Sequence, residues 1–156
     1  IESGADWVVE QYGDTPDRDD IDALPRPSRT LISVSRSLPF TTAVERMHEP
    51  CVLVVIQPEW FARQVPTKLY DYLCTGNPIL VLAPDDSAAW RLARQYERCT
   101  RADPEDVTGI ARALKDLEEQ KKAGRLSQVP TVEDTRHLTK QAINLEFLDH
   151  VKRVSE

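Results

Sequence analysis

Thr67, Lys68 and Asp71 lie close together in the chain and have side chains suited to binding a polar ligand. They follow Pro66 and precede Gly76, in the order in which proline and a hydroxyl residue start a helix and glycine ends it. Unpaired backbone N–H groups and the helix dipole favour phosphate at the amino end of a helix. Lys68 would add a positive charge there. The pattern therefore predicts an anion-binding helix start.

The helix that must position these residues has two faces. With Thr67 as the N-cap, a rotation of 100° per residue places Lys68, Asp71 and Thr75 on one stripe. The other stripe is suited to packing and holds Leu69, Tyr72, Leu73 and Gly76. A simpler interpretation remains open, because Lys68 and Asp71 are also spaced as an exposed i,i+3 ion pair worth about 0.2 to 0.5 kcal/mol.

This helix belongs to a regular alternation of apolar runs and amphipathic segments. Strands are expected at 6–12, 31–35, 51–57, 79–83 and 98–101, and helices at 40–49, 67–75, 86–97, 104–122 and 133–153. The apolar runs are typical of buried parallel strands. The alternation predicts an α/β fold, a Rossmann-like open parallel sheet with helices on both faces.

Ligands of such sheets bind beyond the carboxyl ends of the strands. Gln57 ends the third predicted strand, and the cleft is expected to be lined by Gln57, Pro58, Glu59 and the loop to Gln64. That loop carries Trp60, Phe61 and Arg63. The aromatic rings could cover a base or a sugar, although such residues more often pack on the domain. Arg63 could contact phosphate or remain a solvated charge.

Two later segments also have readable boundaries. Asp103 is expected to cap a helix that begins at Pro104 and ends before Gly124. The last segment, 132–154, has an apolar stripe too broad for a one-sided surface helix. Contact with a second partner and burial under a loop both account for that excess.

Composition limits the class of protein. Of 156 residues, 40% are hydrophobic and 29% are charged, which permits a packed core. A net charge of -6 argues against a nucleic-acid partner, and no apolar run is long enough to span a membrane. Three widely separated cysteines and three histidines lack the spacing of disulfides or of a metal site. We expect a cytoplasmic domain with no metal ion and no other cofactor.

The string P-T-K-L-Y-D-Y-L-C-T-G-N-P-I-L, residues 66–80, resembles a segment of known enzymes. Its counterpart is P-G-K-(F/Y)-E-Y-(L/M)-A-(S/A)-G-(K/R/N)-P-(I/V)-L in the carboxyl-terminal domain of family 4 glycosyltransferases, which have the GT-B fold. The polysaccharide-type members are the most similar. Residues 102–107, A-D-P-E-D-V, and residues 37–40, S-L-P-F, resemble further segments in register, so that the resemblance covers roughly residues 30 to 150.

The resemblance implies a function. Such a domain binds a UDP- or GDP-linked sugar for a retaining hexosyl transfer in polysaccharide or glycoconjugate synthesis, without an obligatory metal. By position, Asp71 would bind the ribose, and Thr67 and Lys68 would face the diphosphate. The expected nucleotide-sugar-binding residues are Gln57, Arg63, Pro66, Thr67, Lys68 and Asp71, and no catalytic residue is identified.

Three positions depart from the family pattern. Asp71 stands where the family usually has the longer glutamate, and Thr67 replaces a glycine. Arg63 stands eight residues before Asp71, where many members carry a glutamate that contacts the sugar. Ribose recognition survives these changes more easily than sugar recognition. A noncatalytic Rossmann-like binding or partner domain is therefore the alternative.

The resemblance also implies that the enzyme is larger than this chain. We expect residues 1–156 to form a single nucleotide-sugar-binding domain, half of a GT-B fold, without its first strand and without the amino-terminal acceptor domain. That acceptor domain would be its partner and the part through which the enzyme could associate peripherally with a membrane. The chain alone is expected to be inactive.

Overall fold

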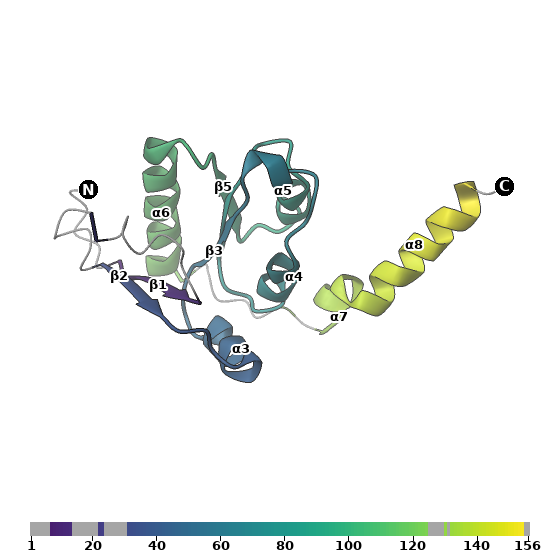
Figure 1. The fold of residues 1–156 in the computed structure, drawn as a ribbon, viewed down its shortest axis with the longest axis horizontal. Coiled ribbons are helices and arrows are strands. Elements are labelled where there is room, and N and C mark those ends of the chain that lie inside the picture. Colours follow the sequence, from purple (N-terminus) through teal and green to yellow (C-terminus); the bar gives the residue numbers. More distant parts are fainter. Residues whose placement is uncertain (1–6, 14–21, 24–30, 125–129, 131, 155–156) are drawn as a thin grey trace. The chain divides into compact units, whose positions relative to one another are not determined.

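The structure is a computed structural model that describes residues 7–13, 22–23, 31–124, 130 and 132–154. Every strand that it describes pairs in parallel, and helices alternate with the strands (Figure 1). The predicted α/β class is confirmed. The chain divides into two compact units, Ile1–Arg46 and Met47–Glu156.

The first unit contains a two-stranded parallel sheet. Strand β1 (Val9–Tyr12) pairs with β2 (Ile32–Ser35) in the register Val9 to Ile32. The backbone N–H of Gly13 extends the ladder by donating to the Ser35 carbonyl at 3.0 Å. Both strands were expected from the sequence, although residue 6 lies outside the described residues. Helix α3 (Phe40–His48) then leads into the second unit.

The second unit contains a three-stranded parallel sheet in the order β3-β4-β5. Its strands are β3 (Leu53–Ile56), β4 (Ile79–Leu82) and β5 (Cys99–Ala102). The central strand β4 buries Ile79, Leu80 and Val81 almost completely. Burial on both faces explains why this strand is a continuous apolar run in the sequence.

Helices cover both faces of this sheet, as predicted (Figure 1). On one face, α4 (Thr67–Leu73) and α5 (Ala88–Ala93) pack through Leu69, Leu73, Ala89 and Ala93 against Leu53, Val55, Ile79 and Val81. On the other, α6 (Val107–Lys122) packs through Ala113 and Leu117 against Leu80 and Ala102. The loop between β3 and α4 therefore starts and ends on elements fixed by the core.

A tight turn connects α4 to β4. Gly76 has a φ of 80°, a left-handed conformation that glycine adopts without strain. The Asn77 side-chain amide donates to the carbonyls of Met47 and Glu49 at 2.7 and 2.8 Å. The Thr75 hydroxyl donates to the Tyr72 carbonyl at 2.8 Å, so Thr75 is a buried part of the turn. The predicted stop signal is confirmed.

Both predicted helix caps are displaced. The N-cap of α4 is Pro66 and not Thr67, because the Pro66 carbonyl already accepts the Leu69 N–H at 2.9 Å. Helix α6 begins at Val107 instead of Pro104, and its N-cap is Asp106, whose carboxylate accepts the Gly109 N–H at 2.9 Å.

Asp103 has a different role. Its carboxylate accepts the Glu105 N–H at 3.0 Å, which makes a local turn ahead of α6. At the other end of the helix, Gly124 follows with a φ of 68°, as the sequence indicated.

The helix predicted at 133–153 is interrupted. The structure has α7 (Val132–Thr135), a 3₁₀ turn η2 (Arg136–Leu138) and α8 (Lys140–Val154). Thr139 breaks the helix, because its backbone is extended. Its hydroxyl accepts the Ala142 N–H at 3.2 Å and so caps the start of α8. Leu138 is buried in the core, whereas Leu145 on α8 is exposed.

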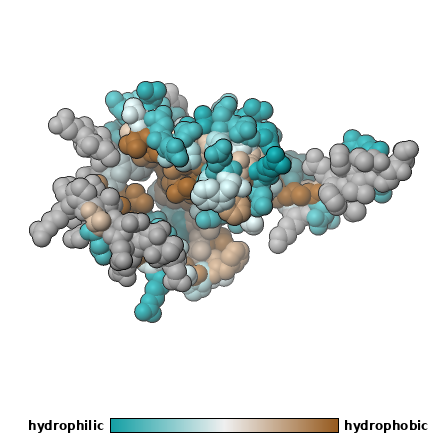
Figure 2. Space-filling model, turned by 45° about the horizontal axis from the view of Figure 1, so that its top comes forward, coloured by the Kyte–Doolittle hydropathy of each residue, from teal (hydrophilic) through white to brown (hydrophobic). Residues whose placement is uncertain are grey.

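The surface of the described residues is mixed in character. Hydrophilic side chains surround separate apolar patches (Figure 2). Large exposed apolar side chains include Ile56, Trp60 and Phe61 after or near the end of β3. No helix among the described residues has both the length and the apolar composition that crossing a bilayer requires.

Replacement of the α6 cap tests this fold. We expect Asp106→Ala to lower the free energy of unfolding by about 1 kcal/mol, because the Gly109 N–H loses its acceptor. Asp106→Asn is the matched control and should retain most of the stability, since asparagine caps helices equally well. Urea unfolding followed by circular dichroism measures both. Equal stability of Asp106→Ala and the wild type would contradict the assigned cap.

Candidate functional site

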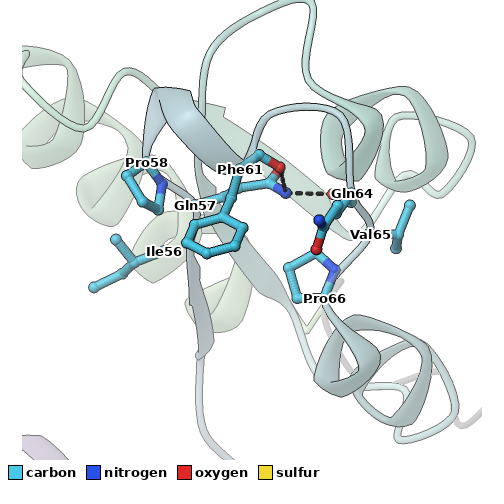
Figure 3. A pocket seen from close by; sticks show the side chains of 7 residues that line it. All are labelled: Ile56, Gln57, Pro58, Phe61, Gln64, Val65 and Pro66. Atoms are coloured by element: carbon cyan, nitrogen blue, oxygen red, sulfur yellow. Dashed lines mark hydrogen bonds between the residues drawn. The ribbon is translucent and has the colours of Figure 1, made fainter.

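A pocket opens at the carboxyl end of β3, where open parallel sheets bind their ligands (Figure 3). Its volume is about 200 Å³. The lining residues come from the end of β3 and from the loop to α4: Ile56, Gln57, Pro58, Phe61, Gln64, Val65 and Pro66. Gln57 extends the sheet, because its backbone N–H donates to the Leu82 carbonyl at 2.8 Å.

The loop is held by its own hydrogen bonds. The 3₁₀ turn η1 (Glu59–Phe61) follows Pro58, whose carbonyl accepts the Phe61 N–H at 3.0 Å. The Ala62 carbonyl accepts the Ala88 N–H at 2.6 Å, which ties the loop to the start of α5. The pocket walls are thus attached to two core elements.

The Gln57 side chain is the central polar group of the pocket. It is only 1% exposed, and its Nε2 donates to the carbonyls of Phe61, at 2.8 Å, and of Gln64 (Figure 3). These two bonds use both amide hydrogens and fix the orientation of the carboxamide. The remaining atom, Oε1, is buried without a hydrogen-bond partner. Gln57 therefore offers the pocket an acceptor and no donor.

The rest of the lining is apolar or uncharged. Phe61 is 49% exposed and is flanked in Figure 3 by Ile56 and Pro66. Among the described residues, no charged side chain lines the pocket. Trp60 is 80% exposed and lies outside the lining, so the expectation that the loop aromatics pack on the domain is wrong for Trp60. The pocket suits an uncharged, flat group better than a phosphate.

The structure brings together only part of the predicted site. Gln57 and Pro66 line the pocket, whereas four other predicted residues are exposed and do not: Arg63, Thr67, Lys68 and Asp71. Thr67 and Lys68 directly follow Pro66, so the start of α4 adjoins the pocket. Helix α4 has seven residues, and so short a helix has a small dipole. Attraction of an anion would therefore depend on the side-chain charges of Lys68 and Arg63.

Asp71 lies one turn along α4. Of the ion pairs between described residues, none joins Asp71 to Lys68, so the simple i,i+3 pair is not formed. Burial raises the pKa of Tyr72 and of Cys74, and the Asp71 carboxylate raises both further. The charge of Asp71 therefore acts on neighbouring side chains of α4. The role of Asp71 in binding a ribose remains a prediction.

Cys74 and Cys99 are not activated nucleophiles. None of the three cysteines forms a disulfide in the structure. Burial raises the pKa of Cys99 to about 12 despite the opposing effect of Arg98, and burial also raises that of Cys74. Thiols with raised pKa values are poorly ionised at neutral pH and therefore react slowly. Within the described part of the chain, no group of three His, Cys, Asp or Glu residues could hold a metal ion.

Most of the pocket wall was predicted: the loop from Gln57 to Gln64 was expected to line the cleft, and Gln57, Pro58, Phe61 and Gln64 do so. Glu59, also expected there, is not among the lining residues. Two lining residues were missed, Ile56 and Val65, because the path of the loop brings them to the pocket and no local pattern encodes that path. One signal was available for the burial of Gln57. It continues the period of two set by the buried residues Leu53 and Val55, which predicts that the Gln57 side chain lies on the buried face of β3.

Comparisons of the chain with protein-family models, with curated proteins and with solved structures found no match. Inference about function therefore rests on the pocket, on the residues around it and on the motif at 66–80. Each of these can be tested separately by substitution.

The role of Gln57 in the loop has a direct test. We expect Gln57→Leu to lower the free energy of unfolding by about 1 to 3 kcal/mol, because the Gln64 carbonyl loses the Gln57 donor and the Phe61 carbonyl keeps only the Gln64 N–H. Gln64→Leu is the matched control, since only the backbone carbonyl of Gln64 takes part and its side chain is exposed. Chemical unfolding of both variants measures the difference. Similar stabilities would show that the Gln57 bonds do not hold the loop.

Proposed function

We propose that this chain is the nucleotide-sugar-binding domain of a retaining glycosyltransferase of the hexosyl type, with a UDP- or GDP-linked donor. One observation carries the proposal. The pocket at the carboxyl end of β3 directly adjoins the start of α4, which bears the motif that resembles family 4 glycosyltransferases. A pocket at this edge of the sheet is the common ligand position in open α/β folds.

In this proposal the donor extends from the pocket across the start of α4. The uncharged pocket takes the flat or apolar part of the ligand, and the diphosphate lies outside it near Lys68 and Arg63. Asp71 accepts hydrogen bonds from the ribose hydroxyls. Both cations are exposed, so neither carries a desolvation penalty before the ligand arrives.

The domain would contribute to catalysis by gripping the donor and by stabilising the leaving phosphate. Preorganised charge of this kind often accelerates a reaction more than any other single effect. The amino-terminal domain of the same enzyme would bind the acceptor. The enzyme would act in polysaccharide or glycoconjugate synthesis at the cytoplasmic side of a membrane. The chain alone is then expected to bind a donor and to transfer no sugar.

A noncatalytic binding domain is the second candidate. The observation that favours it is Arg63, an exposed cation at the position where the resembled enzymes carry a glutamate that contacts the sugar. Such a domain would still bind a nucleotide, because the pocket and the start of α4 are unaffected. Donor hydrolysis measured with the whole enzyme separates the two candidates.

Nucleotide binding can be tested through Lys68. We expect UDP or GDP to bind weakly, and Lys68→Ala to weaken binding by about 1 to 2 kcal/mol through loss of a charge-assisted contact. Lys115→Ala, on an exposed position of α6, is the matched control for net charge. Isothermal titration calorimetry provides the dissociation constants. If the two variants bind alike, Lys68 does not belong to the site.

Asp71 has a more selective test. We expect Asp71→Asn to weaken UDP binding by about 1 to 3 kcal/mol, because the hydrogen bonds to ribose lose charge assistance. Binding of inorganic pyrophosphate, which has no ribose, should hardly change. Asp71→Glu restores the residue usual in the resembled family and should retain nucleotide binding. Parallel losses for UDP and pyrophosphate would rule out the ribose role.

A further inference from the structure

We propose that Gln57 is the base-reading residue of the site, and that its Oε1 accepts a hydrogen bond from the ring N–H of a uracil seated in the pocket. The inference rests on the proposed function and specifies its donor as a uridine nucleotide. Two observations carry it. Gln57 has a buried acceptor without a partner, and the described residues that line the pocket around it are uncharged.

The hydrogen bonding of Gln57 fixes what the ligand must offer. Both hydrogens of Nε2 are used by the Phe61 and Gln64 carbonyls, so turning the amide over would replace two hydrogen bonds by unfavourable contacts between oxygen atoms. Oε1 is then the acceptor that remains. A buried acceptor without a partner is unfavourable, and a ligand N–H would satisfy it.

The walls favour a flat ring. Ile56, Pro58, Phe61, Val65 and Pro66 supply apolar surface, and the pocket volume is about 200 Å³. A hexose would bring several hydroxyl groups to a pocket with few polar side chains, and most of them would lose their hydrogen bonds to water. A phosphate would find no charge on these walls. A nucleobase, with two apolar faces and a polar edge, fits this lining.

The number of donors favours uracil. Uracil attached to ribose has a single N–H, at N3, which matches the single free acceptor of Gln57. The amino groups of cytosine and adenine carry two hydrogens, and guanine has three N–H hydrogens on its edge. In an enclosed pocket each surplus donor lacks a partner, which is costly.

Oε1 is enclosed in the structure, so a wall residue must move to admit the base. Phe61 is suited to this role, because its side chain is half exposed and its ring forms the pocket wall seen in Figure 3. Its ring could then stack on the base, as aromatic side chains do in many proteins that bind nucleotides in single strands. Trp60, the preceding residue, does not line the pocket and provides a built-in comparison.

Calorimetric titration of the wild-type chain with UDP, 3-methyl-UDP and 5-methyl-UDP tests the proposal. We expect 3-methyl-UDP, which lacks the N–H, to bind at least about tenfold more weakly than UDP, as loss of a hydrogen bond to a buried acceptor predicts. The 5-methyl compound keeps the N–H and carries the same added methyl group, so it should bind almost as tightly as UDP. Equal binding of UDP and 3-methyl-UDP would overturn the role of Gln57 while leaving nucleotide binding intact.

Two variants test the position of the base. Phe61→Ala should weaken the binding of UDP severalfold and leave the binding of pyrophosphate unchanged. Trp60→Ala should change the binding of neither ligand. Equal effects of the two variants on UDP would overturn the seating of the base in this pocket. A folded wild-type chain that binds pyrophosphate and prefers no nucleotide would likewise overturn it. A folded chain that binds neither UDP nor GDP would refute the proposed function itself, and the inference with it.

Discussion

The hydrogen bonds of one buried amide, that of Gln57, determine the shape of the candidate site. They join the end of β3 to the carbonyls of Phe61 and Gln64, the first of which also accepts the Gln64 N–H at 3.0 Å. Backbone carbonyls taken out of water need partners, and a loop has no ladder to supply them. The side chain of Gln57 therefore supplies the donors that a neighbouring strand would supply in a sheet. It fixes the position of the loop, and the loop forms the walls of the pocket.

Gln57 Oε1 and Arg98 Nε are the two buried polar side-chain atoms without partners among the described residues, and they differ in context. Arg98 has other contacts, because its guanidinium donates to the Leu73 carbonyl and lies 5.1 Å from the centre of the Tyr96 ring. Tyr96 in turn contacts His137, so Arg98 belongs to the packing that joins α4 to the segment before α8. Gln57 lines a pocket, and its enclosed Oε1 becomes available to a ligand when a wall residue moves.

The sequence predicted the elements well and their ends less well. Buried strands such as β4 are readable because both faces are apolar, and the alternation of elements then restricts the topology.

The caps were displaced because several neighbouring residues can make local bonds: Asp103 and Asp106 both accept backbone N–H groups, and only Asp106 does so at the helix start. Proline likewise fits on either side of a helix boundary, which moved the N-cap of α4 to Pro66. Other features depend on contacts between residues distant in sequence. The break at Thr139 accompanies the burial of Leu138 and the 2.6 Å contact of Tyr96 with His137, neither of which has a local signature. In the candidate site, the position of ligands at the carboxyl ends of parallel strands predicted Gln57 and the loop to Gln64, and the period of two indicated that Gln57 is buried.

The separation of charge from the pocket bears on how the proposed site would work. Lys68 is exposed, and at 4 Å a pair of unit charges in bulk water is worth only about 1 kcal/mol. The same pair gains strength when water is excluded, because the effective dielectric constant falls. A second surface closing over α4 would therefore strengthen the contact of Lys68 with phosphate, while the base, already enclosed in its pocket, would gain little. The domain alone would then select the nucleotide, and stabilisation of the leaving phosphate would require the partner domain.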